Sequence, residues 1–570
     1  MKPSVLRLIA LGAVLLAILD VIFLSFYPIV SFDLWWILAA GREMVRTHRP
    51  LTTDVFSCAI YGKPWLNKYM PLEILLYLLY SGSGPDGLIL VRILLILVSL
   101  GFSFSAIVAW KRKGLIGDYP LLTIALLIAL ASILMSRRLY VGPELFGLAC
   151  FSGFILLWER GHERDLSGRF WALLALNQFI WTNFHGSFFL GFLIAGIYLI
   201  ERAIRRKGIL KTELFGYLLL VSVTFVNPYG WNLHRAVLRV MSTPQYSKFL
   251  MEWFPLFHPF DTYVLRWWAI GAAGVSGAGF WMNRRRLRLS HCLLLLIFLL
   301  MTLKSRRHLV FFSLTAVVAN LWNYGQIFDR WRKKIGSFGY TIAAAGGVWA
   351  FLIIFNYRIV SGEYIHPSQA KRPFGFGILK SLYPWYEAEF MERTGVKGNL
   401  FCRYNCGGFI IWRLTPQVKP FLDGRAEPFP IELMERYWNI LIGEESPDAV
   451  CREFQMTLAL IDHEDEHLLR HFRSSPEWGL CYIGYTAALF LKRTEENAPI
   501  LAEYEIPSAT HLGEKDLQRL RFPSPGEMLR FFPYSDYREM FLIRLKMLEG
   551  LGLIDREKMD EKEVISRFFP

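Results

Sequence analysis

A series of apolar runs constrains the fold of this chain more than any other feature. The runs approach the ~20 residues that cross a bilayer, and they recur from the N-terminus to about residue 358. The first, from Val5 to Val30, is too long for a signal peptide and lacks a small-residue cleavage site, so we expect a retained helix. Hydrophobic residues make up 54% of the chain, which is too many for one soluble domain.

The net charge of +15 is distributed in a way that indicates membrane topology and argues against nucleic acid as the partner. Basic clusters occur in every second loop between apolar runs, which is the positive-inside pattern. They are Lys111–Lys113, Arg160 with Arg164, Arg202–Lys207, Arg284–Arg286 and Arg330–Lys334. The N-terminus is therefore expected in the cytoplasm, and the region after residue 360 outside it.

With these loops as cytoplasmic markers, the sequence predicts an α-helical polytopic membrane domain over 1–360 with about eleven spans. We place them at 5–30, 87–109, 119–135, 143–159, 170–184, 187–201, 213–226, 264–281, 291–304, 308–324 and 340–358. The stretch from Pro71 to Tyr80 is too short to span and is expected at the membrane interface.

Residues 361–570 are predicted to form an external α/β domain with a helical tail. Expected strands are Phe409–Trp412, Val418–Leu422, Thr457–Asp462 and Cys481–Leu491, which are β-branched or aromatic and bounded by Gly, Pro or charge. Expected helices are 428–442, 446–455 and 514–550. Cys402 and Cys406 would face the oxidising side of the membrane. They could form a disulfide across a short loop, or they could remain free thiols.

The outer loops in this topology hold most of the polar residues that the cytoplasmic basic clusters do not account for. They are Asp33, Asp54, Lys68, Glu73, Arg137, Arg138, Glu144, Asn183, His185, Glu252, Arg306, Arg307 and His308. One carboxylate with several cations suits sugar transfer from a lipid-linked phosphate, because a phosphate leaves without a general acid and the acceptor needs one base. Asp33 is the predicted base. The predicted ligands of the donor phosphate are Arg137, Arg138, His185, Arg306 and Arg307.

Several motifs resemble the bacterial C-type glycosyltransferases, multi-spanning enzymes that use polyprenyl-phosphate sugars. These relatives include the protein O-mannosyltransferases and the lipid A aminoarabinose transferase. The motifs are Asp33–Trp36, Ala40–Arg42, Pro50–Ser57, Gly62–Trp65, Pro143–Phe146, Trp181–Gly186, Asn227–Gly230, Glu252–Trp253, Arg307–His308, Gly407–Gly408 and Asp423–Ala426.

The resemblance implies that Asp33 is the catalytic carboxylate and that the chain lies in a bacterial cytoplasmic membrane. It implies an inverting hexosyl- or pentosyltransferase with a polyprenyl-phosphate-linked sugar as donor and a glycan, lipid or protein as external acceptor. No organic cofactor is implied, and a divalent metal stays open because members differ in metal use. Relatives often carry arginine where this chain has Gly142, so Arg137 or Arg138 would have to replace it.

Each motif also has a purely structural interpretation. Asp33 could cap a helix that starts at Leu34, and Asn183–Gly186 or Asn227–Gly230 could be only turns. Arg306–His308 could be an interfacial flank, and Asp423–Arg425 a turn at a strand end.

The rival function is a non-catalytic assembly or transport protein of envelope polysaccharide. A transporter would line its midplane with polar groups, and here Asp20 with Asn177 and Gln178 are the main candidates. A third possibility is a relative that has lost activity. The polar outer loops favour the enzyme.

Overall fold

The computed structural model describes residues 3–116, 120–161, 166–243, 250–258, 265–331, 338–361, 374–507 and 545–554. These residues form two compact units, which we call the helical unit and the sheet unit. The helical unit comprises the described residues up to Tyr27 and from Ser83 to Ser361, with Phe374–Phe376; the sheet unit comprises Pro28–Gly82 and the described residues from Gly377 onward. A simple division at residue 360 therefore differs from the structure, in which the first outer loop belongs with the C-terminal region.

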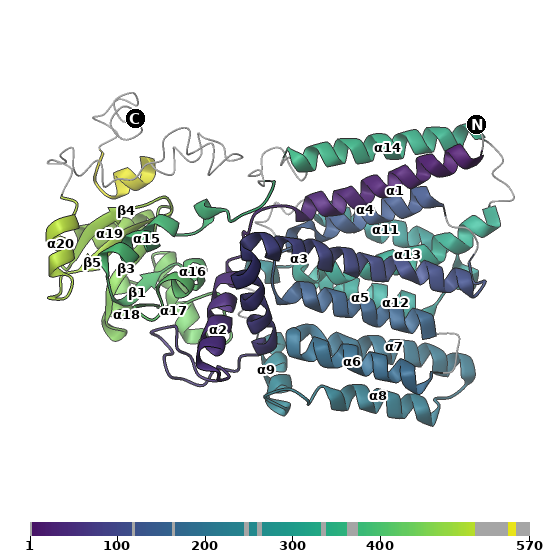
Figure 1. Cartoon of the computed structure of the whole chain (residues 1–570), viewed down its shortest axis with the longest axis horizontal. Helices are drawn as coiled ribbons and strands as arrows, with labels where there is room; N and C mark the ends of the chain where they lie inside the picture. Colours follow the sequence, from purple (N-terminus) through teal and green to yellow (C-terminus); the bar gives the residue numbers. More distant parts are fainter. Residues whose placement is uncertain are drawn as a thin grey trace. The chain divides into compact units, whose positions relative to one another are not determined.

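Every one of the eleven predicted spans coincides with a helix (Figure 1). The helices are α1 (Pro3–Ser25), α3 (Met70–Arg112), α4 (Leu121–Met135), α5 (Pro143–Gly161), α6 (Gly168–Phe184), α7 (Phe189–Arg206), α8 (Lys211–Val223), α11 (Leu265–Met282), α12 (Leu289–Lys304), α13 (Leu309–Trp331) and α14 (Phe338–Val360). Among the described residues, four helical segments are long and apolar enough to cross a membrane on their own: Arg7–Ser25, Met70–Arg112, Leu121–Arg138 and Gly186–Arg206. The protein is thus a multi-helix membrane protein, and the count of eleven spans stays a prediction.

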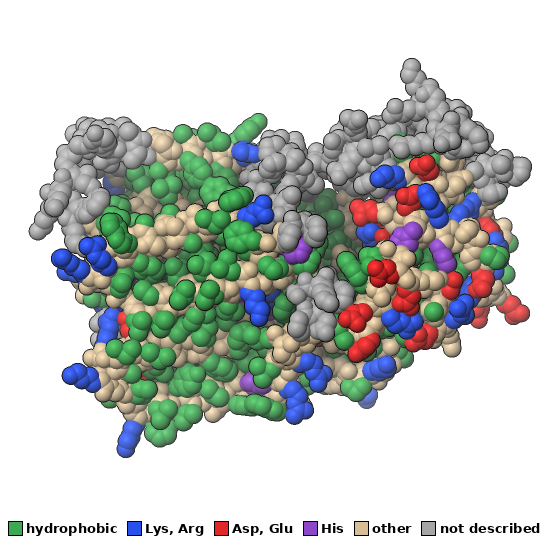
Figure 2. Space-filling model, turned by 180° about the vertical axis from the view of Figure 1, so that it is seen from behind, with side chains coloured by type: hydrophobic (Ala, Val, Ile, Leu, Met, Phe, Trp, Pro, Cys, Tyr) green, Lys and Arg blue, Asp and Glu red, His purple; other side chains and the backbone are tan. Residues whose placement is uncertain are grey.

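Apolar side chains point outward from these helices, as a lipid environment requires. Leu94 on α3 and Leu176 on α6 are more than half exposed, and Figure 2 shows a nearly continuous hydrophobic face over this unit. In water such a face would be far larger than soluble monomers carry. The exposed apolar belt supports insertion of the helical unit in a bilayer.

The first helix ends earlier than the apolar run that encodes it. Helix α1 stops at Ser25, and the chain beyond it leaves the helix, with Ile29 bridged to Ile378. Arg92 on α3 accounts for this end, because its Nε donates to the Ser25 carbonyl (2.9 Å) and its Nη2 donates to the Tyr27 carbonyl. A cation at the C-terminus of a helix also favours the helix dipole.

Helix α3 joins the two units at a kink. Gly84 has φ 66° and ψ −164°, which only glycine adopts readily, and Pro85 follows it. The predicted interfacial stretch Pro71–Tyr80 is the part of α3 that precedes this kink.

The sheet unit contains a five-stranded mixed sheet in the order β2-β1-β3-β5-β4. Its strands are β1 (Gly398–Cys402), β2 (Val418–Pro420), β3 (Met456–Asp462), β4 (Trp478–Ile483) and β5 (Ala487–Lys492). Strand β1 is parallel to β2 and β3, and β5 is antiparallel to β3 and β4. The helices are α2 (Asp33–Thr47), α15 (Trp385–Thr394), α16 (Tyr404–Leu414), α17 (Ile431–Leu441), α18 (Pro447–Glu453), α19 (Glu466–Ser474) and α20 (Ala498–Tyr504).

Two strand predictions in this unit are wrong. Phe409–Trp412 lies in helix α16, where Phe409, Ile410 and Ile411 are all fully buried. A short run buried on every side lacks the alternation that separates strand from helix. Cys481–Leu491 is the hairpin β4–β5 rather than one strand. Of the predicted helix 514–550, only residues 545–550 are described, and they are helical.

Candidate functional site

Three of the predicted outer loops, all in the helical unit, carry the predicted cations. The 3-10 turns η1 (Ser136–Arg138), η3 (Met251–Trp253) and η5 (Arg306–His308) lie in their described residues. The backbone N–H of Arg306 donates to the Phe254 carbonyl (3.0 Å), and the Ser305 hydroxyl donates to the Glu252 carbonyl (3.3 Å). These bonds fix η5 against the loop that carries Glu252.

Arg138 is the centre of an ion-pair cluster formed by these loops. Its guanidinium pairs with Glu144 at the start of α5, with Nε 3.3 Å from Oε1, and with Glu252, with Nη1 2.5 Å from Oε2. The other Glu252 oxygen lies 3.8 Å from Nη1 of Arg307, whose guanidinium lies 4.5 Å from the Trp253 ring centre. The Arg138 side chain is 13% exposed, whereas that of Glu252 is 41% exposed.

The charges in this cluster perturb one another. Burial opposes ionisation of Glu252, but Arg138 and Arg307 together hold its pKa at about 2. Burial and the neighbouring Arg138 and Arg137 lower the pKa of Arg306. Arginines that are distant in the sequence therefore share one electrostatic environment, in which Glu252 is ionised at neutral pH.

His308 is kept neutral in the same cluster. Burial, then Arg307 and Arg138, lower its pKa to about 3. In the unfolded chain the pKa of a histidine is about 6.5. As pH falls from 6.5 toward 3, the unfolded chain takes up a proton that the folded site excludes, so this group removes stability on acidification.

We therefore expect His308→Gln to flatten the stability of the protein between pH 6.5 and 4.5. The wild-type loss attributable to His308 has a limiting slope of about 1.4 kcal/mol per pH unit. Thermal unfolding in detergent at several pH values measures the difference between the two proteins. His48→Gln, at an exposed position, is the matched control, and an unchanged slope in His308→Gln would contradict the assignment.

His185 follows α6 and packs against α5. Its Nδ1 lies 2.6 Å from the Ser187 hydroxyl and accepts the Ser187 backbone N–H (3.2 Å), while the Trp181 indole donates to the same hydroxyl (3.0 Å). A methyl group at Gly147 would lie 2.9 Å from this Nδ1. With Nδ1 accepting, a neutral His185 carries its proton on Nε2. In its protonated form His185 also lowers the pKa of Glu252.

The neighbouring Asn183 has a structural role. Its side-chain amide donates to the carbonyls of Phe179 (2.9 Å) and Val226 (3.1 Å), which ties the end of α6 to the end of α8. This supports the turn interpretation for Asn183.

Asp33 lies in the sheet unit and is the first residue of α2. Phe32 occupies the N-cap position, so the helix begins one residue earlier than the capping alternative requires. The exposed Asp33 carboxylate accepts the indole N–H of Trp36 (3.3 Å). A methyl group on Gly424 would lie 2.4 Å from Asp33 Oδ1, so only glycine leaves room for the carboxylate there.

Beside α2, Asp54 belongs to a buried ion triad. Arg425 binds Asp423 through two bonds, Nε to Oδ1 (2.7 Å) and Nη2 to Oδ2 (2.6 Å), and its Nη1 lies 2.5 Å from Asp54 Oδ2. All three side chains are at most 1% exposed. Burial and Asp423 raise the pKa of Asp54, and Arg425 opposes this. The arginine also lies 4.5 Å from the Trp65 ring centre.

The other two candidates in the first outer loop are paired as well. Lys68 binds Glu427, and it lies 5.0 Å from the Tyr69 ring centre. Glu73 is fully buried and accepts the Asn67 amide (2.6 Å). Neither residue lies as open as Asp33, and both support the loop that presents Asp33.

Sequence reasoning missed the partners that hold this loop. Gly407 and Gly408 allow close contacts: a methyl group would lie 2.1 Å from the Leu422 carbonyl oxygen at the first position and 3.1 Å from that of Phe32 at the second. In the sequence, the motifs Gly407–Gly408 and Asp423–Ala426 were the only indication of these partners. In the structure both motifs contact the predicted first outer loop.

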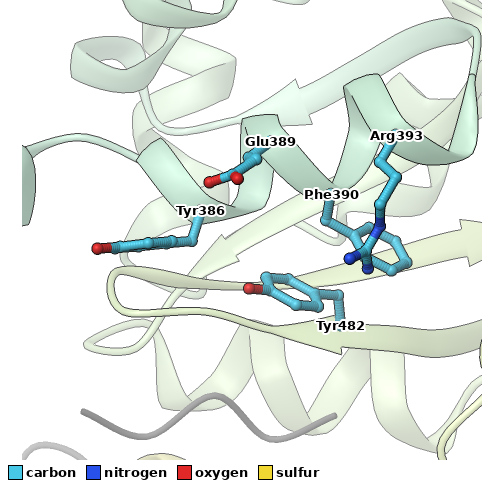
Figure 3. Close-up of a pocket in the computed structure, with 5 residues that line it drawn as sticks. All are labelled: Tyr386, Glu389, Phe390, Arg393 and Tyr482. Atoms are coloured by element: carbon cyan, nitrogen blue, oxygen red, sulfur yellow. The ribbon is translucent and has the colours of Figure 1, made fainter.

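No group of three or more His, Cys, Asp or Glu side chains with metal-binding geometry occurs among the described residues. All seven cysteines are free, and Cys402 and Cys406 are buried. A small pocket is lined by Tyr386, Glu389, Phe390, Arg393 and Tyr482 (Figure 3). It shares no residue with the predicted site.

Comparison with known proteins resolves the fold. No protein-family model matches the sequence, and no curated protein matches it. The archaeal oligosaccharyltransferase AglB from Archaeoglobus fulgidus, solved with an inhibitory peptide and a dolichol-phosphate, aligns over 86% of this chain and 74% of its own, with 12% identity and a TM-score of 0.55. The same enzyme tethered to an acceptor peptide aligns over 85% and 74%, with 13% identity and a TM-score of 0.54.

The chain has a C-type glycosyltransferase fold. This confirms the resemblance seen in the sequence at the level of the fold. ArnT from Cupriavidus metallidurans in the apo state also aligns, over 85% of this chain and 97% of its own, with 12% identity and a TM-score of 0.49.

Proposed function

We propose that this protein is a membrane glycosyltransferase that moves a sugar from a polyprenyl-phosphate donor to an extracytoplasmic acceptor. The observation that carries the proposal is the cluster around Arg138, which gathers Arg306 and Arg307 from a distant loop. Arginine clusters recognise phosphate through charge-assisted hydrogen bonds. The C-type fold and the exposed Asp33 carboxylate support the same reaction.

In this proposal the acceptor hydroxyl attacks the anomeric carbon as the bond from that carbon to the phosphate oxygen breaks. One displacement inverts the configuration, and the phosphate departs on its lipid. Asp33 takes the acceptor proton, while Arg306 and Arg307 stabilise the negative charge on the phosphate. Arg138 holds Glu144 and Glu252 in place, and neutral His308 adds no charge of its own. The transferred sugar is a hexose or a pentose.

The proposed topology has eleven spans, a cytoplasmic N-terminus and an extracytoplasmic C-terminal region, in a bacterial cytoplasmic membrane. Reporter fusions at residues 112, 285 and 400 should read inside, inside and outside. The rival, a transport or assembly protein, would use midplane polar groups such as Asp20, Asn177 and Gln178. The Gln178 amide nitrogen donates to the Phe188 carbonyl (2.9 Å), which gives this side chain a structural contact. The polar groups at the outer loops favour transfer over transport.

A comparison of lipids and glycans between a deletion strain and its parent tests the proposal directly. Loss of the enzyme should leave a polyprenyl-linked sugar that accumulates and a glycan that lacks this sugar. An unchanged lipid and glycan profile would overturn the transferase proposal. A profile in which a complete glycan is made but remains on the wrong side of the membrane would support the transport rival.

Glu252 provides a prediction whose sign is unusual for a site carboxylate. It is ionised, partly exposed, and held tightly by Arg138 but loosely by Arg307. A phosphate must compete with it, so Glu252→Gln should strengthen polyprenyl-phosphate binding by about two- to fivefold, the scale of a partly exposed ion pair. Titration calorimetry with a short-chain polyprenyl phosphate measures this affinity.

Arg307→Gln should weaken polyprenyl-phosphate binding in the same titration. Glu43→Gln, which removes a carboxylate on α2 outside the Arg138 cluster, should leave this affinity unchanged. Weaker binding by Glu252→Gln would show that Glu252 supports the ligand rather than competing with it.

A further inference from the structure

The helix α9 (Trp231–Ser242) has no part in the proposed chemistry, yet its surface is sharply divided. It follows α8 through the turn at Asn227–Gly230, where the Asn227 side chain accepts the Tyr229 N–H (2.8 Å) and donates to the Thr224 carbonyl (2.7 Å). This is the turn interpretation that the sequence left open for that motif. The turn redirects the chain, and α9 lies across the ends of the long helices instead of parallel to them (Figure 1).

One side of α9 packs on the helical unit. Leu233 and Val237 are buried, and the His234 ring meets the Phe188 ring at 5.2 Å in the turn after His185. His234 also bonds Thr224 at the end of α8 (2.9 Å) and stacks on Phe225 (4.6 Å). The helix is therefore anchored at the place where two predicted spans end.

A second flank of α9 is apolar and open. Trp231, Leu238 and Met241 are 56%, 59% and 48% exposed. Their spacings of seven and three residues bring them onto one side of a helix. Exposed tryptophan beside aliphatic residues is typical of a segment at the boundary between acyl chains and head groups.

The third flank is basic. Arg235 and Arg239, four residues apart, are exposed and point to the same side. Neither guanidinium makes an ion pair or hydrogen bond with the described residues. Two unpaired cations next to an open apolar flank match a surface that presents phosphate above hydrocarbon.

We infer that α9 is an interfacial helix that binds the anionic phospholipid head groups of the outer leaflet. The side of α9 that carries Leu233 packs against the helical unit, and the side that carries Leu238 inserts among the acyl chains. Arg235 and Arg239 bind lipid phosphates. Each basic residue near an anionic surface strengthens binding by about fivefold. The inference does not depend on sugar transfer, because it concerns lipid contact alone.

Photo-crosslinking from Leu238 tests this surface in the full chain. Benzoylphenylalanine at 238 is reconstituted in vesicles of phosphatidylcholine and phosphatidylglycerol at 7:3, irradiated, and the lipid adducts are identified by mass. We expect the ratio of phosphatidylglycerol to phosphatidylcholine adducts to be at least about threefold above the 3:7 ratio of the two lipids in the vesicles. The same probe at Leu218, on the exposed side of α8, should give adducts in proportion to the lipid mixture.

Arg235→Gln with Arg239→Gln should reduce the Leu238 adducts to the mole-fraction ratio. Arg284→Gln with Arg285→Gln, an exposed basic pair in another loop, should keep the preference, as should Asp33→Asn. Absence of lipid adducts at 238, or a preference that survives loss of Arg235 and Arg239, would overturn the inference. Replacement of phospholipid adducts by prenyl adducts on adding 1 mol% polyprenyl phosphate would also overturn it, by assigning α9 to the donor.

Discussion

Asp33→Asn is expected to reduce sugar transfer by about 10²–10⁴-fold, the usual cost of losing a general base. Asparagine keeps the size of the side chain and can still accept the Trp36 indole N–H, but it cannot take the acceptor proton. Because Asp33 is exposed, its replacement should leave the protein folded. Turnover of a polyprenyl-phosphate sugar by the purified enzyme measures the effect.

Glu43→Gln is the matched control for this substitution. Glu43 lies on the same helix and pairs with Arg46 (2.6 Å) at its far end, so its loss should leave turnover near the wild-type value. Asp33→Asn should also bind polyprenyl phosphate as the wild type does, since it removes no cation. Near wild-type turnover in Asp33→Asn would exclude Asp33 as the base.

Arg425→Ala is expected to be the most destabilising single change in the sheet unit. It leaves Asp54 and Asp423 buried without their cation, and breaking a buried ion pair from one side typically costs about 3–5 kcal/mol. In a unit of this size the apparent melting temperature should fall by roughly 10 °C. Arg425→Lys should recover only part of the loss, because an ammonium cannot make the paired bonds to Asp423.

Arg436→Ala provides the comparison for the same thermal measurement. Arg436 also binds two carboxylates, Glu445 (3.3 Å) and Glu453 (2.7 Å), but the Arg436 side chain is 33% exposed. Surface pairs of this kind contribute about 0–1 kcal/mol. Equal effects of Arg425→Ala and Arg436→Ala would contradict a stabilising role for burial of the triad. Loss of transfer without loss of stability in Arg425→Ala would instead place Arg425 in the chemistry.

The sequence determined where the helices of the membrane region form. Apolar runs are a local signal, and each predicted span coincides with a helix. The alternation of basic and non-basic loops predicted that the loops carrying Arg137, Arg138, Arg306 and Arg307 lie on one side of the membrane. Strands β2 and β3 also carried local signals. The resemblance to C-type glycosyltransferases rested on short motifs, and the fold confirmed it.

The tertiary structure decided which of those residues meet. Glu252 joins Arg138 to Arg307, and Asp54 pairs with Arg425 from a distant part of the sequence. Helix α16 was mistaken for a strand because burial on all sides removes the periodicity by which the two are told apart. The first outer loop belongs with the sheet because Gly407, Gly408 and Gly424 allow close backbone contact. Local patterns encode secondary structure, whereas pairing between distant charges and glycine contacts depends on how the chain folds back on itself.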